Sequence, residues 1–113
     1  MYELVFDEVI HKQLNKIKTK HDIQKIISDM LNKIELVGPD AGKLIDSKLF
    51  IYEIKCKNPP IRLYYKFKKE KNECYIFEFE MKTSEKKQKT TIEKIKEKTI
   101  KIFRNLNLFL SIS

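Results

Sequence analysis

Side chains that could bind and cleave a phosphodiester fall at alternate positions of neighbouring strand patterns. Arg62, Tyr64 and Lys66 alternate within one pattern, and Lys82 closes the next. Of 24 basic residues only Arg62 and Arg104 are arginine, so a guanidinium inside a strand is distinctive. A guanidinium can hold a phosphate through two parallel hydrogen bonds, and a tyrosine ring can stack on a base. These residues predict a nucleic-acid site on an open sheet face.

Glutamates at matching positions add acid–base chemistry to this face. A ribose 2′-hydroxyl that attacks its adjacent phosphate needs a base, a cation for the developing charge, and an acid for the departing 5′-oxygen. Arg62 would stabilise the charge, and Glu53 or Glu80 would be the base. The acid would be Lys82, or Lys66 with its pKa lowered by neighbouring cations. This chemistry requires no metal and no cofactor.

The same pattern fits a purely structural interpretation. Arg62 can pair with Glu53 or Glu80 in a cross-strand salt-bridge network. The pattern alone leaves both interpretations open.

The charge is concentrated in the second half of the chain. The net charge is +8, with 10 basic and 9 acidic residues in 1–60 but 14 and 7 in 61–113. Such a field favours polyanions, of which nucleic acid is the most common, although a coding bias toward lysine would give the same excess. The length of 113 residues and 42% hydrophobic content predict a single globular domain over 1–113.

The sequence gives little support for a metal site, a redox-active cysteine pair or a catalytic histidine. Cys56 and Cys74 fall in different strand patterns without Cys-x-x-Cys spacing, so we expect reduced thiols and no metal site. His11 and His21 lie near the ends of predicted helices and are expected at the surface or as capping residues. The sequence from Met1 lacks a basic lead and a long apolar run, which predicts a cytoplasmic protein without a membrane span.

Two helices are predicted in the first part of the chain. Residues 2–6 form a strand pattern, after which Asp7 can cap a helix. A longer helix follows Asp22 with a wide apolar stripe, and Gly38-Pro39 ends it. Residues 40–48 are predicted to be a loop.

Three strands and a helix are predicted in the rest. From Leu49 the apolar period becomes two, and Asn58-Pro59-Pro60 and residues 69–73 separate the strands. The last strand is predicted to bury Tyr75, Phe77, Phe79 and Met81. A final helix begins at Thr90 or Thr91, and the apolar segment 106–112 is expected to dock on the body or on a partner. The result is an α+β fold of order β-α-α-β-β-β-α, with an antiparallel sheet of about four strands.

Four short motifs in this order resemble the RelE/ParE superfamily of toxin components, especially its HigB-like and phage Gp49-like branch. The motifs are Gly42-Lys43-Leu44, Leu49 to Lys55, Ile61-Arg62-Leu63-Tyr64-Tyr65, and the strand end Phe79 to Ser84 that leads into Gln88. The resemblance extends over nearly the whole chain. The resemblance implies one RelE-like domain with two N-terminal helices and one C-terminal helix.

The resemblance also implies a function. Members of this superfamily are small basic ribonucleases that cleave messenger RNA, often on the ribosome, without metal and under the control of an antitoxin protein. Arg62 and Lys82 correspond to the basic residues that support the phosphate. Basic residues expected to contact the RNA are Lys43, Lys48, Lys55, Lys66 and Lys86.

The chain departs from the pattern at one place. Many active members carry a histidine or tyrosine near the end of the last strand or in the C-terminal segment, and Lys82 to Thr91 contains neither. Tyr64 is the well-placed aromatic substitute. Two alternatives therefore stand beside the toxin: a catalytically inactive nucleic-acid binder of the same fold, and a protein-interaction module.

Overall fold

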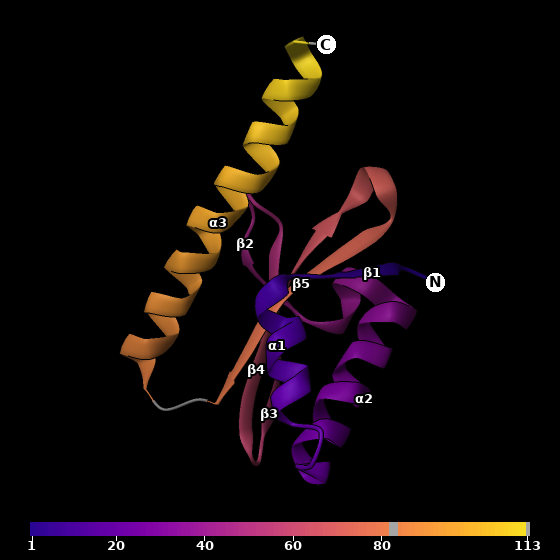
Figure 1. Ribbon diagram of the computed structural model, residues 1–113, viewed down its shortest axis with the longest axis vertical. Coiled ribbons are helices and arrows are strands. Elements are labelled where there is room, and N and C mark those ends of the chain that lie inside the picture. Colours follow the sequence, from indigo (N-terminus) through magenta and orange to yellow (C-terminus); the bar gives the residue numbers. More distant parts are fainter. Residues whose placement is uncertain (82–83, 113) are drawn as a thin grey trace. The chain divides into compact units, whose positions relative to one another are not determined.

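A mixed sheet of five strands, ordered β1-β5-β4-β3-β2, organises residues 1–81 of the computed structural model (Figure 1). The structure describes residues 1–81 and 84–112, without the side chains of 103–112. The chain divides into two units, Met1–Met81 and Lys82–Ser113. The strands are β1 (Glu3–Phe6), β2 (Lys43–Asp46), β3 (Ile51–Lys57), β4 (Pro60–Lys68) and β5 (Glu73–Met81). β1 runs parallel to β5, and the other neighbours are antiparallel.

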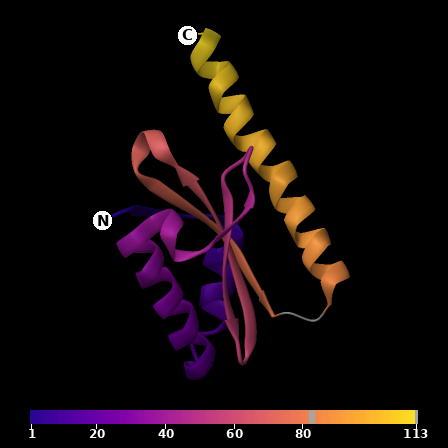
Figure 2. The same cartoon turned by 180° about the vertical axis from the view of Figure 1, so that it is seen from behind.

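Helices α1 (Glu8–Lys16) and α2 (His21–Val37) pack on one face of the sheet (Figures 1 and 2). Asp7 caps α1 by accepting a hydrogen bond from the Val9 amide at 3.0 Å. Gly38 ends α2 with φ of 56°, a conformation that glycine adopts without steric cost. The apolar stripe predicted for α2 is confirmed as core. The shared cluster contains Ile10, Ile27, Met30 and Ile34 from the helices, Ile17 at the C-cap of α1, and Ile54, Ile61, Leu63 and Tyr65 from the sheet.

The predicted loop at 40–48 contains a strand, and this expectation was wrong. After a short 3-10 helix, Gly38–Ala41, the chain forms β2 and pairs Lys43 with Glu53 at the edge of the sheet. The order is therefore β-α-α-β-β-β-β-α. Leu49 and Phe50 belong to the β2–β3 turn, so β3 begins two residues later than predicted.

A β-bulge in β5 reverses the predicted orientation of half of that strand. Tyr65 pairs with Ile76 and Tyr64 with Glu78, which leaves Phe77 as an extra residue. As a result Ile76 and Cys74 lie in the core cluster, while Phe77 is buried, as predicted, but outside that cluster. Met81, which was also predicted to be buried, is 37% exposed. Phe79 follows the bulge and is in the core, as predicted.

Gln13 of α1 completes the edge of β5 beyond the end of β1. Its Nε2 donates to the Phe79 carbonyl at 2.8 Å, and its Oε1 accepts from the Phe79 amide at 2.9 Å. β1 reaches only as far as Ile76, so the side-chain amide takes the place of a further strand residue. This pairing satisfies two backbone groups that the edge would otherwise leave open.

We expect Gln13→Ala to lower the free energy of unfolding by about 1–3 kcal/mol, because two hydrogen bonds are lost and partly buried backbone groups stay unsatisfied. Gln24→Ala, at an exposed position of α2, is the matched control. Chemical denaturation followed by circular dichroism measures both. Equal stability of the two variants would contradict the role given to Gln13.

The second unit contains helix α3 (Glu85–Ile112). It begins earlier than the predicted Thr90 or Thr91, because the Ser84 hydroxyl accepts a hydrogen bond from the Lys87 amide at 3.1 Å. Thr91 and Ile95 are buried positions on one face of this helix. The side chains of the apolar segment 106–112 lie outside the described residues, so its predicted docking stays a prediction. Nowhere in the described chain is a helix both long and apolar enough to cross a membrane.

Candidate nuclease site

Polar side chains from β3, β4 and β5 meet on the sheet face opposite α1 and α2. Antiparallel pairing sets Arg62 beside Glu80, and Tyr64 beside Glu53 on one flank and Glu78 on the other. We call Glu53, Arg62, Tyr64, Glu78 and Glu80 the polar cluster. The sequence correctly predicted that Glu53, Arg62, Tyr64 and Glu80 share a face.

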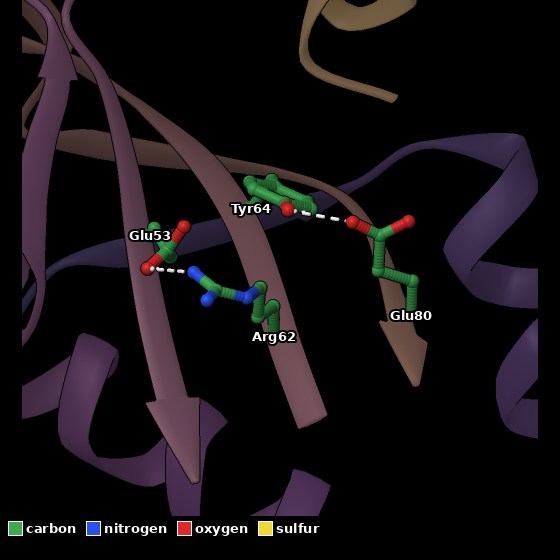
Figure 3. A network of polar contacts seen from close by, with 4 residues as sticks. All are labelled: Glu53, Arg62, Tyr64 and Glu80. Carbon is green, nitrogen blue, oxygen red and sulfur yellow. Dashed lines mark hydrogen bonds and ion pairs between the residues drawn. The ribbon is translucent and has the colours of Figure 1, made fainter. Parts of the chain in front are cut away.

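Arg62 forms an ion pair with Glu53 across β3 and β4 (Figure 3). Arg62 Nη1 donates to Glu53 Oε1 at 2.7 Å. Only 9% of Arg62 and 5% of Glu53 are exposed. The prediction that Arg62 projects into solvent on an open face was therefore wrong, and the predicted cross-strand salt bridge is confirmed. A guanidinium tolerates burial here because a carboxylate neutralises it.

One nitrogen of Arg62 is left without a partner. Nε is buried and makes no hydrogen bond within the described residues. An unsatisfied donor on a buried charged group is costly. The guanidinium therefore has capacity for a further acceptor, and its planar donors suit an oxyanion.

Tyr64 is fully buried and is hydrogen-bonded to the last glutamate of the cluster. Its hydroxyl donates to Glu80 Oε1 at 2.7 Å (Figure 3). Burial and this hydrogen bond raise the pKa of Tyr64 well above that of a free phenol. In this conformation the ring offers no surface for the base stacking predicted from the sequence.

Lys66 lies toward the other end of β4 and is half-buried. Its ammonium group donates to the Leu49 carbonyl at 2.5 Å. Its pKa is lowered, as predicted, but burial is the larger cause and the neighbouring Lys68 the smaller one. A lysine with a lowered pKa is a better general acid near neutral pH.

The remaining predicted residues are spread over the chain. Lys43, Lys48 and Lys55 are exposed on β2, the β2–β3 turn and β3. Lys86 is exposed on α3, in the second unit. Lys82 lies outside the described residues.

The cysteines and acidic residues indicate no other chemistry. Cys56 and Cys74 form no disulfide bond. Burial is the larger cause and the negative charge of Glu73 the smaller cause that together raise the pKa of the Cys74 thiol to about 11. A protonated, buried thiol is a poor nucleophile. Across residues 1–81 and 84–112, no three His, Cys, Asp or Glu side chains are arranged to hold a metal ion.

The strand alternation places Glu78 on the same face as Glu80, but the sequence predicted no role for it. Only 6% of this residue is exposed, and it pairs with Tyr64 in the sheet. Its position two residues before Glu80 was the available signal.

Comparison with known proteins gives a match to solved structures. The isolated E. coli RelE toxin superposes with a TM-score of 0.61 at 22% identity, covering 84% of this chain and 99% of that one. The chain has the RelE fold. A RelE variant with two arginines changed to alanine, in the free state, matches with a TM-score of 0.62 at 21% identity over 83% of this chain and 97% of that one.

The RelE fold also appears in a match to an assembled complex. The intact E. coli RelBE toxin–antitoxin complex matches with a TM-score of 0.60 at 24% identity, covering 74% of this chain and 100% of that chain. No family model matches the sequence, and a search of curated proteins found no match. At these identities the solved structures establish the fold.

Proposed function

We propose that this chain is the toxin of a toxin–antitoxin system, a metal-independent endoribonuclease that cleaves messenger RNA on the ribosome. We place it in the HigB-like and phage Gp49-like branch of the RelE/ParE superfamily, with 1–113 as one domain. The observation that carries the proposal is the RelE fold over 84% of this chain, shared with a protein described as a toxin. The unpartnered Nε of Arg62 and the +8 net charge are consistent with a phosphodiester ligand.

Binding of RNA exchanges one anion for another at Arg62. A phosphate oxygen replaces the Glu53 carboxylate and a second oxygen takes the Nε hydrogen, so the guanidinium is never left unpaired. Since Arg62 is 9% exposed, the cluster must open before the substrate enters. Opening is therefore a step of the reaction.

Once the phosphate has replaced it at Arg62, the Glu53 carboxylate can accept a hydrogen bond from the ribose 2′-hydroxyl. Glu53 takes the proton of the 2′-hydroxyl, the 2′-oxygen forms a bond to phosphorus, and the bond from phosphorus to the 5′-oxygen breaks. Arg62 stabilises the added charge on the phosphoryl oxygens. Lys82 or Lys66 protonates the 5′-oxygen, and the products are a 2′,3′-cyclic phosphate and a 5′-hydroxyl.

The expected result is cleavage of a messenger RNA by the purified chain when ribosomes are present, and any cleavage of free RNA should keep its rate in excess EDTA. Fragments should end in 2′,3′-cyclic phosphate and begin with 5′-hydroxyl, because the nucleophile is the RNA's own hydroxyl. Mapping both ends and repeating the assay on purified ribosomes tests the chemistry and the ribosome dependence separately. Fragments with 5′-phosphate ends, or loss in EDTA of cleavage that occurs on free RNA, would contradict the mechanism.

An antitoxin partner follows from the same proposal. The matched RelBE structure is a complex of a toxin with its antitoxin, and an acidic or amphipathic segment would suit the cationic surface of this chain. A short acidic protein encoded beside this one, and its co-purification with this chain, would support that inference.

The second candidate is a catalytically inactive RelE-fold module that binds nucleic acid or protein. The burial of the Arg62–Glu53 ion pair favours it, since the cationic group is already neutralised. Such a module would bind RNA with a steep salt dependence, or a protein partner tightly, and no condition would yield fragments.

A further inference from the structure

The β2–β3 turn, residues 47–50, presents an aromatic ring in a strained backbone. Phe50 has φ of 54°, in the left-handed region that bulky residues rarely adopt. The residue is 51% exposed and does not belong to the core cluster. Folding thus gains little from this ring and accepts backbone strain to place it, a combination that is concentrated at functional sites.

Neighbouring groups fix the turn from several sides. Asp46 Oδ1 accepts hydrogen bonds from the amides of Lys48 at 3.0 Å and Leu49 at 2.8 Å. The Phe50 carbonyl accepts from the Phe67 amide at 3.1 Å. The conformation of residue 50 is therefore determined by its surroundings rather than by the preference of phenylalanine.

Lys66 contacts the Phe50 ring. Its ammonium lies 5.8 Å from the Phe50 ring centroid while it donates to the Leu49 carbonyl. This distance is within the range of a cation–π interaction. The exposed Lys48 lies two residues before Phe50. Asp46 and Glu70 are the acidic groups that act on Lys66, and one oxygen of Asp46 is already engaged by the turn.

An exposed ring beside lysines has the composition of a single-strand nucleic-acid site. Bases stack on aromatic side chains whatever their sequence, and lysines bind the adjoining phosphates. Phe50 lies in the turn that leads into β3, three residues before Glu53 of the polar cluster.

We propose that Phe50 is a stacking platform for one nucleobase of single-stranded RNA, with Lys66 positioning the ring and Lys48 binding a neighbouring phosphate. The choice of RNA as ligand rests on the proposed function. The proposal adds an aromatic contact to a chain whose predicted aromatic residue, Tyr64, is buried.

Phe50→Trp gives a direct readout, because the chain contains no tryptophan. Titration with a single-stranded RNA of twelve mixed-sequence nucleotides should quench the emission of this single indole, while the affinity stays close to that of the wild type. An emission that does not change at saturating RNA would overturn the proposal.

The RNA affinity and its dependence on salt concentration distinguish the contribution of base stacking from that of phosphate contacts. Phe50→Gly removes the ring and also the backbone strain, so it should fold at least as stably as the wild type and bind the same RNA about 5- to 100-fold more weakly. Its slope of log affinity against log salt should be unchanged. Lys48→Ala should instead make the slope shallower by about 0.7. Leu36→Ala, at a residue 65% exposed on α2, is the control and should change nothing.

The two proposals fail in different ways. Wild-type affinity in Phe50→Gly would overturn the stacking proposal even if RNA is cleaved. If Phe50→Trp is quenched by RNA and Phe50→Gly binds RNA more weakly, but the wild-type chain cleaves no RNA, the stacking proposal is supported and the ribonuclease proposal is wrong. If Phe50→Gly weakens a protein complex but not RNA binding, the ring serves a protein partner and the stacking proposal is wrong.

Discussion

Arg62→Ala is expected to slow RNA cleavage by about 10²- to 10³-fold, the typical loss when a group that stabilises transition-state charge is removed. The same change should also destabilise the fold by about 3–5 kcal/mol, because it leaves the buried Glu53 carboxylate without its cation. Cleavage of a labelled messenger RNA and chemical denaturation measure the two effects.

A second variant separates lost chemistry from lost folding. Arg62→Met combined with Glu53→Met removes both charges and keeps much of the apolar volume, which is often neutral or stabilising for a buried ion pair. We expect this double variant to fold like the wild type and to have no cleavage activity. A stable double variant that cleaves at the wild-type rate would show that the polar cluster has no catalytic role.

Glu53→Gln should change RNA binding and RNA cleavage in opposite directions. The amide cannot neutralise Arg62, so the guanidinium becomes available to phosphate and the RNA affinity should rise. The amide cannot accept the 2′-hydroxyl proton either, so cleavage should fall by about 10²- to 10⁴-fold. Binding to a 2′-O-methyl RNA, which has no attacking hydroxyl, measures affinity without turnover.

Two controls define the role of Glu53. Glu8→Gln, on an exposed glutamate of α1, should leave both quantities unchanged. Glu80→Gln leaves the Arg62–Glu53 pair in place and should not tighten binding. If Glu53→Gln tightens binding and also speeds cleavage, Glu53 only restrains Arg62 and the base is another group. If it weakens binding, the proposed exchange of carboxylate for phosphate is wrong.

The main elements could be predicted from the sequence because their patterns are unambiguous. The apolar stripe of α2 repeats over several turns and Gly38-Pro39 marks its end. β2 was missed because it is four residues long, its Lys-Leu-Ile-Asp sequence does not alternate, and it exists through pairing with β3. The bulge in β5 was missed because both Ile76 and Phe77 are apolar, so either could belong to the core.

The sequence predicted which polar residues share a sheet face, but it did not predict how deeply their side chains are buried. Alternation identifies which residues share a face of a strand, and it placed Glu53, Arg62, Tyr64 and Glu80 together. Alternation contains no information on where a long side chain ends or on whether the face is exposed. The 2.7 Å contact between Arg62 and Glu53 depends on the register of β3 against β4, which is set by the folded sheet.

The most direct test of the account is a nuclear magnetic resonance measurement on the Arg62 guanidinium. The chain contains only two arginines, so ¹⁵N labelling gives two Nε–H signals, and Arg62→Lys assigns them. We predict that saturating 2′-O-methyl RNA shifts the Arg62 signal, because the buried Nε gains a phosphate oxygen as its acceptor. An Arg62 signal that stays in place while the RNA is bound would contradict the central claim that this residue binds the phosphodiester.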